Sequence, residues 1–195
     1  TIILAIVLLL NFSCTDWLDV KPVDRMSEDQ LYSTEAGFRQ ALNGIYVELN
    51  HADLYGDELL VNTVEILAQR YKFSSMGTLT NQYHLAEFDY TTDYAKKCGS
   101  RIWEKAYALI ANVNKLLKNA DSHKDLFTGD SYDLITGEAY ALRAFLHFDL
   151  LRLFGPVYKT HKEDKSICYN TQFSLSGSDL LPASKVMEYV IADLK

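Results

Sequence analysis

The sequence predicts a mainly all-α fold of tetratricopeptide-like antiparallel helix hairpins, interrupted by a long, irregular, aromatic-rich loop. Apolar residues recur at helical spacing over several long stretches. The chain of 195 residues contains only 3 Pro and 9 Gly, which disfavours a sandwich or barrel. Hydrophobic residues make up 48% of it and charged residues 23%, enough apolar material to bury one core.

The first 26 residues have the pattern of an export signal and a tether. Residues 2–10 form an uninterrupted apolar run, too short for a bilayer span of about 20 residues. We interpret residues 1–13 as a secretory lipoprotein signal without its basic start, Cys14 as the lipidation site and residues 14–26 as a tether. Asn11 departs from the Leu usual three positions before a lipidated Cys, and an ordinary Cys in the mature protein is the alternative.

The next segment predicts a helical hairpin. Ser27 and Gln30 match a capping box, so a short helix begins there, and Thr34 can cap the following helix. Apolar residues of that helix recur at i, i+3, i+4, i+7, i+8 and i+11: Phe38, Ala41, Leu42, Ile45, Tyr46 and Leu49. After a turn at 51–56, a second helix is expected over 57–70, with Leu60, Val64 and Leu67 on its apolar face.

Helical periodicity then disappears between residues 71 and 100. This segment mixes aromatic and polar side chains, with Gly77 and Gly99 as breakers. A loop of this length inside a compact domain is uncommon and often functional.

A second hairpin follows the loop. A helix is expected from Arg101, with Trp103 on its apolar stripe and therefore in the core. A polar turn at 119–131 leads to a central helix within 137–158, buried over more than one face, with Phe145 and Phe148 widening its apolar stripe. Gly155 is expected to end it in the left-handed conformation, before Pro156.

The last part predicts irregular structure and a final helix. Residues 158–181 are rich in Ser and Thr, and Ser184 can cap a helix after Pro182. Its expected apolar face contains Met187, Val190, Ile191 and Leu194. Because this stripe reaches Lys195, we expect residues 27–195 to be the N-terminal part of a longer domain.

Charge and motif content argue against nucleic-acid binding and catalysis. The net charge of −7 disfavours binding to a phosphate backbone. Glu138 and Asp149 on one helix would lie about 16 Å apart, too far for a glycosidase pair. His147, four residues after Arg143, is expected to be packed or hydrogen-bonded in the core. We therefore predict no catalytic residues, no metal site, no cofactor and no enzymatic activity.

The cysteine count leaves one question open. Three is an odd number, so assigning Cys14 to a lipid leaves Cys98 and Cys168. Their spacing matches no metal motif, and a disulfide or two separate buried thiols are both compatible with the sequence.

Five segments in order resemble the N-terminal part of the SusD/RagB family of bacterial outer-membrane nutrient-binding lipoproteins. They are CTDWLDVKP (14–22), ALNGIYVEL (41–49), IWEKAYALIANVNKLL (102–117), GEAYALRAFLHFDLLRLFGPVY (137–158) and ASKVMEYVIADLK (183–195). The resemblance implies a lipid-anchored, surface-exposed outer-membrane protein. It would capture a glycan ligand as a lid on a SusC-like TonB-dependent transporter barrel and pass oligosaccharides to it.

The family's binding residues vary, so candidates come from the residues themselves. Sugars present flat C–H faces to aromatic rings and hydroxyls to amides and carboxylates. The loop offers Tyr71, Phe73, Tyr83 and Tyr90 for stacking, and Asn81 and Asp89 as hydroxyl partners. The alternative is that these side chains pack the loop onto the helical body.

Three functions remain compatible with these features. The favoured one is a cell-surface glycan-binding lipoprotein of a nutrient-uptake system. A tetratricopeptide-like protein-interaction scaffold or a peptide-binding member of the same system is the alternative. The third is a secreted glycosidase whose catalytic residues lie outside this sequence.

Overall fold

The computed structural model describes residues 26–73, 80–174 and 177–195. The predicted signal, lipidation site Cys14 and most of the tether lie outside the described residues, as does Gly77. Every regular element in these ranges is a helix, and the only strand-like pairing in them is an isolated bridge between Lys165 and Pro182. The predicted all-α class is confirmed.

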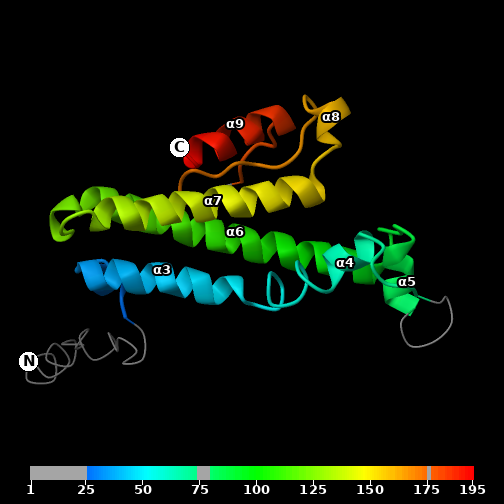
Figure 1. Ribbon diagram of the computed structural model, residues 1–195, viewed down its shortest axis with the longest axis horizontal. Coiled ribbons are helices and arrows are strands. Elements are labelled where there is room, and N and C mark those ends of the chain that lie inside the picture. Colours follow the sequence, from blue (N-terminus) through cyan, green and yellow to red (C-terminus); the bar gives the residue numbers. More distant parts are fainter. Residues whose placement is uncertain (1–25, 74–79, 175–176) are drawn as a thin grey trace, which may run out of the picture.

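Four helices make the body of the molecule. In Figure 1, α6 (Asp93–Ser122) and α7 (Ser131–Phe154) run antiparallel through the middle, with α3 (Glu35–Leu49) on one side and α9 (Ala183–Asp193) on the other. α6 packs against both α3 and α7, and α7 packs against α9. One core therefore joins the helices, with Phe38, Ile110, Leu116, Leu146 and Val186 among its most buried side chains.

The N-terminal caps have the predicted geometry. Before α2 (Glu28–Leu31), the Gln30 amide donates to Ser27 Oγ at 3.3 Å, and the Ser27 amide donates to Gln30 Oε1 at 3.1 Å. Thr34 Oγ1 accepts from the Gly37 amide at 3.1 Å and starts α3. These local signals decided where both helices begin.

The predicted helix over 57–70 is wrong, because only α4 (Thr63–Leu67) forms there. The Glu58 carboxylate is buried and accepts from Asn62 Nδ2 at 3.1 Å, from Thr63 Oγ1 and from Arg101 of α6. These bonds hold residues 57–62 as turns around the carboxylate. Leu60, expected on an apolar face, is exposed.

The segment 71–100 contains more helix than its sequence suggested. α5 (Thr80–Ala86) lies inside it, and α6 begins at Asp93 instead of Arg101, with Thr92 Oγ1 accepting from the Ala95 amide at 3.3 Å. The first two turns of α6 bury only Ala95 and Cys98, too few positions to produce a periodic apolar signal.

Two predictions about α7 need correction. Gly155 has φ −85°, so it is extended rather than left-handed. A Cβ at this position would lie 2.4 Å from the Leu151 carbonyl oxygen, and the glycine is required by that close approach. Phe145 is exposed instead of extending the buried stripe. Trp103 packs against the core as expected, with its ring edge-to-face on Phe154 at 5.2 Å.

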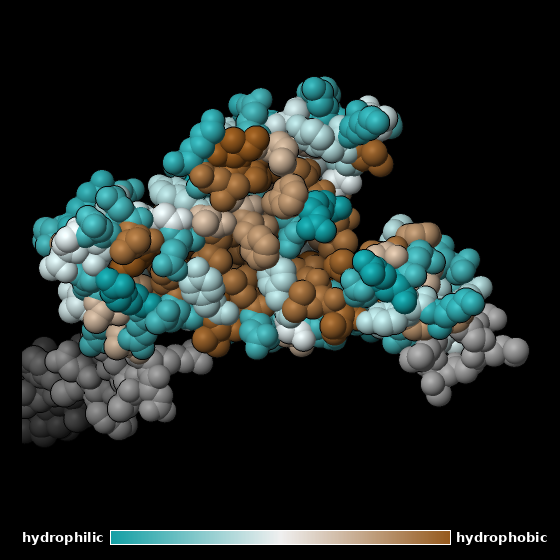
Figure 2. Space-filling model, in the orientation of Figure 1, coloured by the Kyte–Doolittle hydropathy of each residue, from teal (hydrophilic) through white to brown (hydrophobic). Residues whose placement is uncertain are grey.

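The C-terminal helix also departs from its prediction. Pro182, not Ser184, stands at the N-cap of α9, while Ile191 and Leu194 are exposed. The predicted irregular stretch contains the short α8 (Tyr158–His161), and the turn before α7 contains the 3-10 helix η2 (Lys124–Leu126). Figure 2 shows hydrophobic side chains gathered over the middle of the visible face.

Candidate ligand-binding site

The predicted ligand-binding residues all lie at one end of the molecule, formed by the segment after α4, by α5 and by the turn before α6 (Figure 1). We call residues 69–73 and 80–90 the aromatic end. Gln69 Nε2 donates to the Ala86 carbonyl at 2.7 Å, and the Tyr71 hydroxyl donates to the Val61 carbonyl at 2.9 Å. These two bonds tie the segment after α4 to its neighbours.

Tyr71 and Phe73 form a pair in which one ring is exposed and the other packed. Their rings meet edge-to-face at 5.9 Å. Tyr71 is 44% exposed, whereas Phe73 packs against a small second core of Ile66, Leu85 and Ala95. Tyr71 can therefore meet a ligand, while Phe73 mainly supports it.

The candidates Asn81, Tyr83 and Asp89 differ in exposure and in the contacts that they already make within the protein. Asn81 is exposed on α5, and Tyr83 on the same helix lies edge-on to His84 at 5.7 Å. Asp89 Oδ1 accepts from the Thr91 hydroxyl at 2.6 Å and from the Thr91 amide at 3.0 Å, which lowers the pKa of Asp89. Asp89 is thus a charged acceptor that also holds the turn before α6.

Tyr90 is the candidate with the clearest site geometry. Its side chain is 58% exposed and lines a cavity of about 370 Å³ at the junction of the aromatic end with α6 and α7. Leu67, Leu85 and Phe154 contribute apolar walls, and Lys96 contributes a cation. An exposed phenol beside an apolar hollow suits a ligand with one apolar face and several hydroxyls.

The structure does not bring the six predicted residues into one pocket. Tyr90 lines the cavity, whereas none of the other five predicted residues belongs to its lining. Sequence reasoning also missed Phe88, which is 51% exposed and has φ +58°. A non-glycine residue in this conformation is strained, and such strain gathers at binding sites. Only its aromatic side chain could have marked Phe88 as a candidate in the sequence, because a strained backbone conformation has no sequence pattern of its own.

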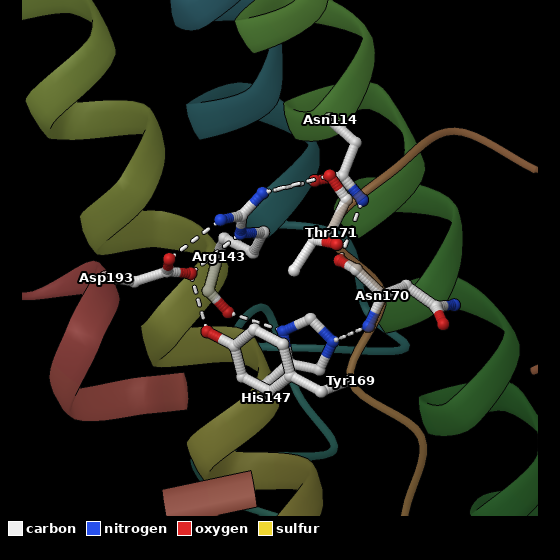
Figure 3. A network of polar contacts seen from close by, with 7 residues as sticks. All are labelled: Asn114, Arg143, His147, Tyr169, Asn170, Thr171 and Asp193. Carbon is white, nitrogen blue, oxygen red and sulfur yellow. Dashed lines mark hydrogen bonds and ion pairs between the residues drawn. The ribbon is translucent and has the colours of Figure 1, made fainter. Parts of the chain in front are cut away.

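A second gathering of polar groups lies between α6, α7 and α9 (Figure 3). Arg143 makes two bonds of 2.7 Å to Asp193, and its Nη1 donates to Asn114 Oδ1 at 2.8 Å. Tyr169 donates to Asp193 at 2.6 Å, and Asn114 Nδ2 donates to the Asn170 carbonyl at 2.8 Å. We call Asn114, Arg143, His147, Tyr169, Asn170, Thr171 and Asp193 the polar network.

His147 is a buried member of this network, and its two contacts define where its proton lies. Its Nδ1 lies 2.8 Å from the Arg143 carbonyl, an acceptor, and its Nε2 lies 3.1 Å from the Asn170 amide, a donor. The neutral ring with the proton on Nδ1 satisfies both contacts. Burial lowers the pKa of His147 to about 4. His147 is thus packed and hydrogen-bonded, as predicted, and the network holds segment 169–171 and α9 on the body.

Two of the cysteines and two carboxylates of α7 lie outside both the aromatic end and the polar network. Cys98 and Cys168 are separate free thiols without a disulfide between them, and of the two Cys98 is buried and Cys168 half-buried. Glu138 accepts from Tyr46 and Asp149 from Tyr55, so the two carboxylates have different partners.

Within residues 26–73, 80–174 and 177–195, no group of His, Cys, Asp and Glu could hold a metal ion. No helix in the same ranges is long and apolar enough to cross a membrane.

Comparison with known families gives a match over most of the chain. A family model described as SusD-like, starch-binding and associating with the outer membrane matches residues 16–181. SusD-like protein P2 of Formosa agariphila is 28% identical over 97% of the chain, and SusD-like protein P25 of the same organism is 27% identical over 74%. The chain spans 36% and 28% of these relatives' lengths, about a third.

Solved structures share the fold. A SusD superfamily protein from Bacteroides fragilis superimposes with a TM-score of 0.69 at 17% identity, over 84% of this chain and 38% of that one. One from Bacteroides thetaiotaomicron gives a TM-score of 0.61 at 21% identity, over 82% and 36%. The helical arrangement in Figure 1 is therefore similar to that of these larger proteins.

Proposed function

Because the chain belongs to the SusD-like family, whose description is starch-binding and associating with the outer membrane, we propose that it is part of a cell-surface glycan-binding lipoprotein. The protein captures oligosaccharides or polysaccharides and passes them to a SusC-like TonB-dependent transporter barrel. It is held on the outer membrane by acyl chains on Cys14 and does not cleave its ligand.

The exposed Tyr90 beside the 370 Å³ cavity is the observation that best supports a sugar ligand at the aromatic end. Pyranose rings have apolar C–H faces that pack on aromatic rings, and hydroxyls that pair with amides and carboxylates. Tyr71, Phe88 and Tyr90 supply exposed rings, while Asn81 and Asp89 supply polar partners. We propose that a glycan lies across these rings, with the cavity receiving one apolar edge of it.

Affinity electrophoresis of the full-length protein without its lipid tests this proposal. Migration through gels containing different polysaccharides is expected to be retarded by at least one of them, without release of reducing ends. Replacing Tyr71 and Tyr90 by Ala should weaken the retardation. Tyr158→Ala is a matched control, because Tyr158 is similarly exposed on α8. If no polysaccharide retards the protein, glycan capture is contradicted and a protein scaffold or peptide binding becomes the better function.

A further inference from the structure

A second set of exposed rings lies along α7 and α3, away from the residues proposed above. Phe145 of α7 is 45% exposed, and Tyr46 of α3 is 43% exposed. The half-buried Tyr55 ring stacks on Phe145 with a centroid distance of 5.1 Å and an interplanar angle of 21°. The Tyr55 ring thus covers one face of the Phe145 ring, while much of the Phe145 side chain stays exposed to solvent.

Polar groups occur at intervals along the same row. Glu138, Phe145 and Asp149 are spaced by seven and four residues, which places them on one face of α7, with Phe145 about 10 Å from Glu138 and about 6 Å from Asp149 along the helix axis. The Tyr46 hydroxyl donates to Glu138 Oε2 at 2.9 Å, and the Tyr55 hydroxyl donates to Asp149 Oδ2 at 2.7 Å. These bonds hold the two carboxylates beside the rings.

Arg152 completes the row on the far side of Asp149. Its Nη1 donates to Asp149 Oδ1 at 2.9 Å, and its side chain is largely solvent-exposed. We call Tyr46, Tyr55, Glu138, Phe145, Asp149 and Arg152 the α7 face. It contains rings for apolar contact, carboxylates that accept from hydroxyls and a guanidinium that donates to them.

The charged groups of the α7 face favour a sugar over a polypeptide helix as its ligand. A polypeptide helix packed on the α7 face would bury two carboxylates and a guanidinium, and removing such charges from water is costly unless they are fully paired. The centres of protein interfaces are accordingly depleted of charged residues. A sugar has hydroxyls that replace water at the carboxylates while its C–H face covers the ring.

From this alternation of rings and charges we infer that the α7 face is a second glycan-binding surface, which binds an oligosaccharide with one pyranose unit over Phe145 and hydroxyls of the flanking units bonded to Glu138 and Asp149. The inference rests on the proposed glycan-binding function, and it adds a site that lies outside the aromatic end. A polysaccharide long enough to reach both surfaces would be bound more tightly than at either alone.

The test measures affinity of the full-length protein for the polysaccharide that retards it most. Phe145→Ala is expected to weaken binding about three- to tenfold, the effect of losing one ring contact. Glu138→Gln keeps the shape of the side chain and should weaken binding by a smaller factor. Tyr158→Ala, equally exposed outside both surfaces, should leave the affinity unchanged. Melting temperatures must stay close to wild type, and Tyr46→Ala provides a second ring deletion if Phe145→Ala does not fold.

The outcomes separate this inference from the proposed function. Weaker binding in the Phe145, Tyr46 and Glu138 variants supports the α7 face. Unchanged binding in them, together with a loss in Tyr90→Ala, overturns the α7 face and leaves the proposed function standing. Unchanged affinity with impaired glycan uptake by cells would show a protein contact here and would also overturn the inference. A wild-type protein that binds no polysaccharide contradicts both.

Discussion

The polar network and the aromatic end use their side chains in opposite ways. In the network, Arg143 bonds to both Asp193 and Asn114 inside the protein (Figure 3). Among buried side-chain polar atoms of the described residues, only Asn170 Oδ1 lacks a partner. At the aromatic end, Tyr71, Phe88 and Tyr90 keep large parts of their rings in solvent. Groups that are saturated within the protein stabilise the fold, whereas exposed rings remain available for a ligand.

The largest effect on stability is expected from breaking the network. Arg143→Ala leaves the Asp193 carboxylate and Asn114 without their partner in a buried setting, and should lower the free energy of unfolding by about 3–5 kcal/mol. Arg152→Ala removes an exposed ion pair and should cost less than about 1 kcal/mol. Urea denaturation measures both. Similar losses of unfolding free energy in the two variants would contradict the expected difference between a buried and an exposed ion pair.

A pH effect of nearly the same size is expected from His147. Its pKa in the folded state is about 4, below the ordinary value of 6.5, so the unfolded chain binds more protons between these values. Stability should therefore be fully present above about pH 6.5 and should fall as the pH drops towards 4, by up to about 3 kcal/mol.

His147→Gln isolates this contribution, because the variant cannot bind the proton. The difference in unfolding free energy between wild type and variant should shrink as the pH is lowered through that window. A difference that stays constant would mean that His147 does not remain neutral in the folded state.

A smaller effect of opposite sign is expected at Phe88. Asn tolerates the left-handed backbone better than Phe, so Phe88→Asn should raise the free energy of unfolding by up to about 1 kcal/mol. It should also weaken glycan binding, because an exposed ring is removed. Thermal unfolding measures the expected gain in stability, and affinity electrophoresis measures the expected loss of glycan binding. A clear loss of stability would show that the Phe88 ring packs against the protein.

The smallest change in stability is expected at Tyr90. Its side chain is more than half exposed, so Tyr90→Ala should alter the free energy of unfolding by no more than about 0.5 kcal/mol. Glycan affinity should nevertheless fall about three- to tenfold. Isothermal titration with the retarding polysaccharide gives the affinity, and a stable variant with unchanged affinity would remove Tyr90 from the proposed site.

The sequence alone determined the helical class, both early caps, the course of α3 and the middle of α6 and α7. It could do so because a long amphipathic helix repeats its signal many times, and because the side chains of Ser27, Gln30 and Thr34 act on amides within three residues. The location of the six candidate residues at one end also followed from their proximity in the chain.

Only the tertiary structure decided how distant residues combine. Arg143 is 29 residues from Asn114 and 50 from Asp193, and no local pattern links these positions. The buried Glu58 carboxylate holds turns around it where the sequence predicted a helix. The sequence did not reveal this, because the partner Arg101 lies 43 residues away. Burial likewise decided which rings serve the core and which reach solvent: Phe73 packs against Ile66, Leu85 and Ala95, while Tyr90 stays exposed beside its cavity. Exposure depends on which elements cover a side chain, and that is settled only when the helices pack.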